Sequence, residues 1–144
     1  MDVIGLLNDL TGNNLLGWKV ALCSGVIALA GLQLALAARL WGVGGLRLQP
    51  DTAAVVHRWN GRAVLVGAAL VGLSCVAGPA GPTSPTRVLL HSLFGSALFA
   101  VLVVKLSLLK FSRSGQRYLP VTGSALFLLF LAIWATSVAD YISR

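Results

Sequence analysis

The sequence predicts an all-α integral membrane protein, a four-helix bundle whose successive spans run up, down, up and down. Of its 144 residues, 57% are hydrophobic and only 10% are charged, against about 25% charged in an average soluble domain. The apolar residues fall into four runs, and each run is long enough to cross a bilayer with about 20 residues. Because the connections are short, neighbouring spans are expected to be antiparallel. Residues 1–144 therefore form a single membrane domain.

Each expected span is bounded by residues that flank or stop a membrane helix. Residues 1–17 are mildly amphipathic and are expected to lie along the membrane surface. The run Pro50-Asp51-Thr52 is typical of a helix start, and the proline- and glycine-rich residues 78–85 stop any helix. A basic, polar loop is expected at residues 110–117. The spans are predicted at about residues 18–41, 53–77, 87–109 and 119–139.

The basic residues predict the orientation of the spans. Eight lie on the side of the loops that join spans one to two and three to four: Arg39, Arg47, Arg58, Arg62, Lys105, Lys110, Arg113 and Arg117. Three lie on the other side: Lys19, Arg87 and Arg144. Because cytoplasmic loops carry the excess of Lys and Arg, both loops are expected in the cytoplasm and both termini outside the cell membrane. Three of the four acids, Asp2, Asp9 and Asp140, fall on the expected outer side.

Aromatic residues are expected at the two membrane surfaces. Six fall near span ends, as an interfacial belt requires: Trp18, Trp41, Trp59, Trp134, Tyr118 and Tyr141. The basic residues lie between apolar runs and not in a patch interleaved with aromatics, so the charge of +7 indicates a bilayer partner and not nucleic acid.

The two histidines are the first candidates for function, because an ionisable ring inside a span is expensive. Both occur as His-x-x-x-Gly, in His57–Gly61 and His91–Gly95. Residues i and i+4 share a helix face, so each glycine leaves bare backbone beside the imidazole. A flat macrocycle such as haem can approach there while the ring nitrogen ligates its iron. The plainer alternative is that glycine serves helix packing and histidine lies at the interface.

The positions of the histidines predict two separate sites. Counting from the turn near Pro82 places His91 level with residues 73–75 of the second span, close to its outer end. His57 lies near the cytoplasmic end, about 25 Å away at 1.5 Å per residue. The two rings are therefore not expected to ligate one metal within a protomer.

Three cations are expected near the cytoplasmic histidine. Lys105 lies about four turns beyond His91 and reaches the level of His57. With Arg58 and Arg62 it could pair with two haem propionates or with another anionic head group. The alternative is that Lys105 extends toward lipid phosphate.

Two cysteines are expected at the outer level. Cys23 and Cys75 fall at similar depth to His91, together with Ser74, Thr136 and Ser137. The cysteines could form a disulfide, could be soft metal ligands, or could be buried small apolar side chains.

Two resemblances follow from these residues. The stretches His57–Arg62 and Leu90–Gly95 resemble the His-x-x-x-Gly spans of four-helix b-type membrane cytochromes, the bacterial cytochrome b-561 and ferric-reductase-like proteins. The whole chain, notably AGPTSPTRVLLHSLFGS and LAIWATSVADY, resembles an uncharacterised family of small four-span actinobacterial proteins. The cytochrome resemblance implies haem b at His57 and His91 and electron transfer. Unlike those cytochromes, spans one and four carry no partner histidine.

We therefore expect an integral-membrane electron-transfer protein, or a subunit of a respiratory or redox complex, that binds haem b. The alternative is a non-enzymatic accessory or scaffold subunit, with a quinone or lipid site between His57, Arg62 and Lys105. Expected partners are the lipid bilayer and other membrane redox subunits or further copies of the chain. No P-loop, HExxH, nucleophile elbow or intramembrane carboxylate pair is present, so the sequence leaves open whether the chain is an enzyme and offers little support for catalysis by the isolated chain.

Overall fold

The computed structural model describes residues 9, 12, 14–44, 46–77, 84–111 and 114–142. Four long α-helices and one short 3-10 helix make up this part of the chain: α2 (Leu15–Leu40), α3 (Pro50–Ala77), α4 (Pro85–Phe111), η1 (Ser114–Tyr118) and α5 (Leu119–Ile142). Within them, four segments are long and apolar enough to cross a membrane: Gly17–Leu40, Pro50–Val76, Pro85–Phe111 and Leu119–Ala139. The all-helical architecture with four candidate spans is thus confirmed.

The helices begin where the sequence provides starting residues. The Asn14 side chain accepts a hydrogen bond from the backbone N–H of Gly17, 3.0 Å away, and caps α2. The third helix begins at Pro50, as its start pattern predicted, with Asp51 in the first turn. Ahead of α4, the Ser84 hydroxyl accepts from the backbone N–H of Arg87 at 3.3 Å. Both ends of each long helix lie within about one turn of the ends of the predicted span.

The expected loop at residues 110–117 is partly helical. Helix α4 continues through Lys110 and Phe111, and η1 occupies Ser114–Tyr118. Several sequence predictions lie outside the described residues: residues 1–8, 10, 11 and 13 of the expected surface segment 1–17, the helix-stopping residues 78–83, the positions of Asp2, Arg113 and Arg144, and the side chains of Asp140 and Tyr141.

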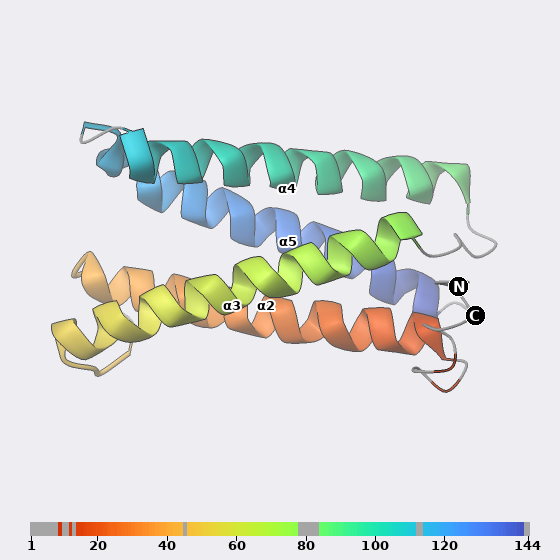
Figure 1. The fold of residues 1–144 in the computed structure, drawn as a ribbon, viewed down its shortest axis with the longest axis horizontal. Coiled ribbons are helices and arrows are strands. Elements are labelled where there is room, and N and C mark those ends of the chain that lie inside the picture. The colour runs from red at the N-terminus through yellow and green to blue at the C-terminus, as the bar shows by residue number, and fades with distance from the viewer. Residues whose placement is uncertain are drawn as a thin grey trace.

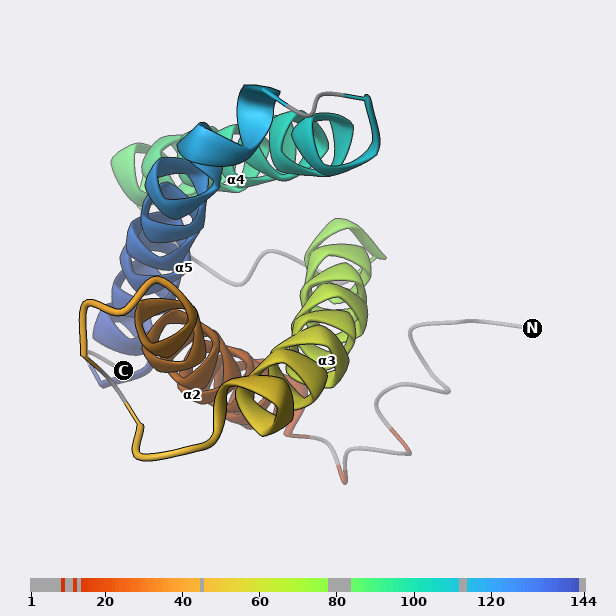
Figure 2. The same cartoon turned by 90° about the vertical axis from the view of Figure 1, so that its left-hand side faces the viewer.

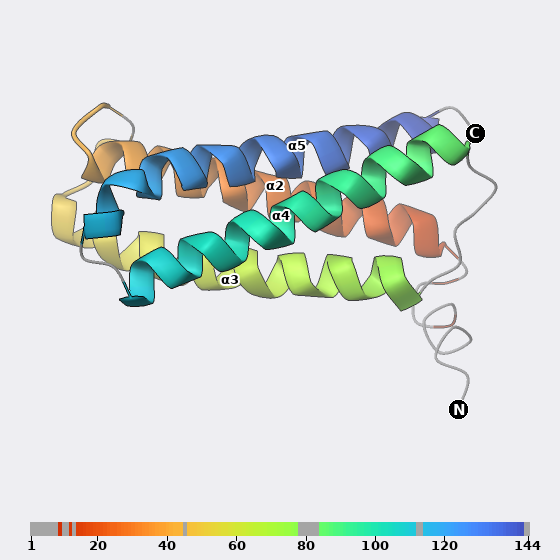
Figure 3. The ribbon, with the colours of Figure 1, turned by 90° about the horizontal axis from the view of Figure 1, so that it is seen from above.

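Successive long helices run in opposite directions along the long axis, as Figure 1 and Figure 3 show. Helix α2 packs against α3 and α5, and α4 packs against α5. Figure 2 shows the result from one end, an open arc in the order α3, α2, α5, α4. Helices α3 and α4, consecutive in sequence, are not a packed pair and make only scattered contacts.

The core follows from this order of packing. Its buried residues come mainly from the two central helices α2 and α5, with single contributions from α3 and α4: Cys23, Val26, Ala30, Ala68, Leu98, Leu126, Phe130 and Ile133. Helix α4 buries only Leu98 among its described residues. Helices α3 and α4 carry many large exposed apolar side chains, which suits contact with lipid tails.

Most of the described aromatic residues of the predicted belt are exposed, namely Trp18, Trp41, Trp59 and Tyr118. Trp134 is different. Its indole Nε1–H donates to the Ser24 hydroxyl at 2.9 Å and its ring packs against the core. This tryptophan joins α5 to α2 and does not belong to the interfacial belt.

Candidate functional site

The two histidines lie in separate places. His91 Nε2 is 4.0 Å from Cys75 Sγ on α3, whereas His57 precedes Cys75 by 18 residues on the same helix. At 1.5 Å per residue this separation is about 27 Å along α3. The alignment of His91 with residue 75, inferred from the turn, therefore agrees with the structure.

The His57 ring takes part in a polar network between α2 and α3. The Asn60 amide Nδ2 donates to the backbone carbonyl of Leu29 and to Gln33 Oε1, both at 2.8 Å. Gln33 Nε2 in turn lies 3.1 Å from His57 Nε2. Asn60 is the buried polar residue of the described core, only 8% exposed. The sequence reasoning did not single out Gln33 or Asn60 as partners of His57.

This network determines the tautomer of His57. The Leu29 carbonyl can only accept, so Asn60 must direct its NH₂ group there, and Gln33 Oε1 must be the acceptor of the second bond. Gln33 Nε2 is then the donor to His57 Nε2, whose lone pair is occupied. The proton of the neutral ring lies on Nδ1, a buried atom without a hydrogen-bond partner.

Gly61, the glycine of the first motif, has no free space beside it. A Cβ added at Gly61 would lie 2.9 Å from Gln33 Nε2, a distance that real Cβ contacts do not reach. The space beside His57 that the motif predicted is therefore filled by the Gln33 amide. In this arrangement the bare backbone of Gly61 lets α2 and α3 approach closely.

The second histidine is held differently. His91 Nδ1 lies 3.1 Å from Thr136 Oγ1 on α5, and that hydroxyl donates to the Ile133 carbonyl at 2.8 Å. Thr136 Oγ1 therefore accepts the Nδ1–H of His91, which leaves the Nε2 lone pair directed toward Cys75 on α3. Metal-ligating histidines characteristically donate their other ring N–H in this way.

The glycine of the second motif has open space beside it. A Cβ added at Gly95 would meet nothing within 4 Å. On the facing helix, a Cβ at Gly72 would lie 3.0 Å from the ring of Phe99, so an aromatic ring already packs on the bare backbone there. The clearance expected of a haem motif is present at Gly95 and absent at Gly61.

Two cations lie at the same end of the bundle as His91: Arg87, one turn before it on α4, and Lys19, near the start of α2. The Arg87 guanidinium Nε donates to the Thr136 carbonyl at 2.9 Å. A haem carries two propionates, and arginine and lysine are their usual partners. The sequence reasoning assigned these two residues only to the orientation count.

The three cations predicted near His57 do not gather around it. Lys105 is half-buried, and its Nζ lies 3.6 Å from where a Cβ of Gly123 on α5 would be. In the described residues no hydrogen bond or ion pair engages its ammonium. Arg58 is exposed, and the exposed Arg62 guanidinium stacks 4.7 Å from the Trp59 ring centre.

Both cysteines are free thiols. Cys23 is buried, at 4% exposure, and belongs to the core, whereas Cys75 is exposed. Of the three possibilities left open by the sequence, the small apolar role fits Cys23, and the structure forms no disulfide between the two. Cys75 is the thiol that faces His91.

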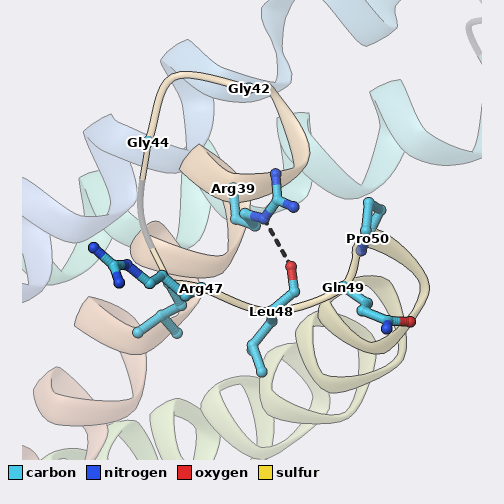
Figure 4. A pocket seen from close by; sticks show the side chains of 8 residues that line it. Arg39, Gly42, Gly44, Arg47, Leu48, Gln49 and Pro50 are labelled. Carbon is cyan, nitrogen blue, oxygen red and sulfur yellow. Dashed lines mark hydrogen bonds between the residues drawn. The ribbon is translucent and has the colours of Figure 1, made fainter.

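A pocket of about 570 Å³ lies in the loop between α2 and α3, about two turns from His57. Arg39 Nε donates to the Leu48 carbonyl at 2.8 Å and closes the loop, and Gly42 and Gly44 adopt positive φ angles that allow its turn. Figure 4 shows Arg47 extending away from Arg39, so the two guanidinium groups do not converge. We assign no chemistry to this loop.

Fold and site together define a small helical protein with four membrane-span-capable helices and two separated histidine sites. The chain belongs to a family of unknown function, DUF6529, which matches residues 4–144. No curated protein and no solved structure matches the chain. The membership agrees with the expectation of an uncharacterised family, links the chain neither to b-type cytochromes nor to actinobacteria, and assigns no activity.

Proposed function

We propose that the chain is an integral-membrane electron-transfer protein, or the subunit of a redox complex, that binds haem b through His91. The supporting observation is that Thr136 holds the Nδ1–H of His91, so that Nε2 faces the open side between α3 and α4, one turn from the clearance at Gly95. Haem b, when bound, supplies one-electron ferric–ferrous chemistry. The residues of the chain bind it, orient it and neutralise its propionates through Arg87 and Lys19.

The resemblance of the two His-x-x-x-Gly stretches to b-type membrane cytochromes carries over best to the second. His57 Nε2 is occupied by Gln33, and Gly61 has no space beside it. A haem at His57 would require Gln33 to move away. The proposal therefore places haem at His91 first.

The proposed placement is in the cell membrane with an up-down-up-down topology and both termini outside. The excess of basic residues on the side of the connections from α2 to α3 and from α4 to α5 supports it. In this orientation His91 lies near the outer surface and Lys105 near the cytoplasmic one. In a Cys75→Ser background, a cysteine in place of Arg47 should be labelled by a membrane-impermeant reagent only after the cells are opened.

The test of haem binding is a reduced-minus-oxidised spectrum of the purified protein with its haem content per chain. We expect equimolar haem in the wild type, retention in His57→Ala and loss in His91→Ala. A colourless wild-type protein, isolated from cells supplied with haem, would refute the proposal. Retention of all haem by His91→Ala would refute the assignment to this histidine.

A glycine pair provides the steric control. Gly95→Leu fills the open space and should lower haem content while circular dichroism shows unchanged helicity. Gly25→Leu is the matched variant, because a Cβ at Gly25 also meets nothing within 4 Å and α2 carries no histidine. If both variants bind haem like the wild type, clearance at Gly95 is irrelevant to binding.

Lys105 favours a second candidate, an accessory subunit of a larger membrane complex. A charged group inside a span calls for a partner, yet the described part of the chain gives this ammonium none. The acids of the chain are Asp2, Asp9, Asp51 and Asp140, and none of them falls within the four spans expected from the sequence. A different membrane subunit, an anionic lipid or a quinone carbonyl would complete the site.

Co-purification tests this second candidate. We expect the wild type to carry another membrane subunit in fixed stoichiometry and Lys105→Met to lose it, with the quinol-linked activity of the complex reduced. Lys110→Met, at the exposed end of α4, is the matched control. A stable, monodisperse monomer in mild detergent would contradict the accessory role.

A further inference from the structure

The proposed haem site raises the question of what lies opposite His91. The sequence has no third histidine, and the first and fourth spans contain no histidine at all. In the structure, Cys75 on α3 faces the free nitrogen of His91, with Sγ 4.0 Å from Nε2. This thiol comes from a different helix, so the pair joins α3 to α4 across the open side of the arc (Figure 2).

Two protein ligands are too few for a bare metal ion. Structural zinc takes four ligands from side chains, and no group of three or more His, Cys, Asp or Glu residues able to hold a metal ion exists among the described residues. Haem iron needs only two, because the porphyrin supplies four nitrogens. The composition of the pair therefore fits haem and not an isolated ion.

The spacing of the pair fits axial ligation. If the bonds are as long as those of zinc, about 2.0 Å to imidazole nitrogen and about 2.3 Å to thiolate sulfur, two ligands on opposite sides of a metal lie about 4.3 Å apart. The observed 4.0 Å is slightly shorter. A small separation of α3 from α4 closes the difference, and these helices are not a packed pair.

Both helices provide small residues next to their ligand. Gly95 follows His91 by one turn, and Gly72 precedes Cys75 by about one turn. The Phe99 ring, 45% exposed, lies against Gly72 and fills the space beside that backbone. Phe99 would turn outward to admit the macrocycle.

We propose that Cys75 is the second axial ligand of the haem bound at His91, an inference that rests on the proposed function. On binding, the Cys75 thiol releases its proton to solvent and its sulfur donates a lone pair to the iron, with no change of oxidation state. A thiolate donates more electron density than a second imidazole. The reduction potential is therefore lower than that of a bis-imidazole haem.

The test compares the ferric absorption spectrum, the electron paramagnetic resonance signal and the reduction potential of purified variants. The wild type should show a low-spin imidazole–thiolate signal. Cys75→Ser should keep haem through His91 and lose that signal to a high-spin one. Cys75→His should convert it to a bis-imidazole signal with a raised potential. Cys23→Ala is the control, since this buried thiol does not face His91, and should match the wild type.

The outcomes separate this inference from the proposed function. If the wild type binds haem and Cys75→Ser leaves its spectrum and potential unchanged, Cys75 is not the ligand, although haem binding stands. If the wild type carries no haem, both are overturned.

A labelling measurement needs no substitution. N-ethylmaleimide should modify Cys75 in the haem-free fraction of a wild-type preparation and not in the haem-loaded fraction. Equal labelling of the two fractions would overturn the ligation.

Discussion

The buried amide of Asn60 should stabilise the pairing of α2 with α3. Its Nδ2 makes two hydrogen bonds of 2.8 Å, to the Leu29 carbonyl and to Gln33 Oε1. Interhelical hydrogen bonds in membrane proteins contribute about 0.6 kcal/mol on average and about 1.7 kcal/mol at most. We therefore expect Asn60→Ala to lower the free energy of unfolding by about 1–3 kcal/mol, from the two lost bonds.

Reversible unfolding in mixed micelles with increasing dodecyl sulfate, followed by circular dichroism, measures this loss. Ser74→Ala is the matched control on the same helix, because the Ser74 hydroxyl donates only to Val71 within its own turn, and its effect should be small. Combining Asn60→Ala with Gln33→Ala should cost less than the sum of the two single changes, because they share one bond. Equal effects of Asn60→Ala and Ser74→Ala, or strict additivity with Gln33→Ala, would refute the network.

Three further predictions concern other contacts between helices. Gly67→Ala should destabilise the fold by about 1–3 kcal/mol through overpacking, because its Cβ would lie 2.6 Å from Val26 Cγ2. Adding Val26→Ala should recover part of this lost stability in the same unfolding assay. A double variant no more stable than Gly67→Ala alone would contradict the contact. Trp134→Phe and Ser24→Ala should each cost about 0.6 kcal/mol and be non-additive, since they remove the same hydrogen bond. In haem-free protein, mass spectrometry should find one maleimide on Cys75 before unfolding and a second on Cys23 only afterwards; rapid labelling of Cys23 in the folded protein would contradict its burial.

Much of the helical framework could be predicted from the sequence, because its determinants are local. Apolar runs and starting residues such as Pro50 and Pro85 set the helix ends without help from tertiary contacts. The level at which His91 meets Cys75 and Thr136 also followed from counting residues outward from a short turn. Depth in a membrane helix is proportional to residue number, so sequence determines it well.

The lateral arrangement could not be predicted in the same way. Which face of a span meets which neighbour depends on packing among all four helices, and nearly every face of these spans is apolar. The sequence therefore did not reveal that Gln33 faces His57 and Asn60, although a lone amide within an apolar span was a signal that it needs a partner. For the same reason Arg62 stacks on Trp59 instead of joining Lys105, and Trp134 packs inward.

The two His-x-x-x-Gly motifs have the same pattern, and the residue opposite the glycine makes them different. At Gly61 that residue is Gln33, whereas Gly95 faces open space. If clearance decides haem binding, Gln33→Ala should free the Nε2 lone pair of His57 and open the space at Gly61, and haem content per chain should rise. His57→Ala combined with Gln33→Ala is the control and should return haem content to the wild-type level. An unchanged haem content in a folded Gln33→Ala protein would mean that the histidine and its glycine are insufficient, and that an opposing ligand such as Cys75 distinguishes the second motif.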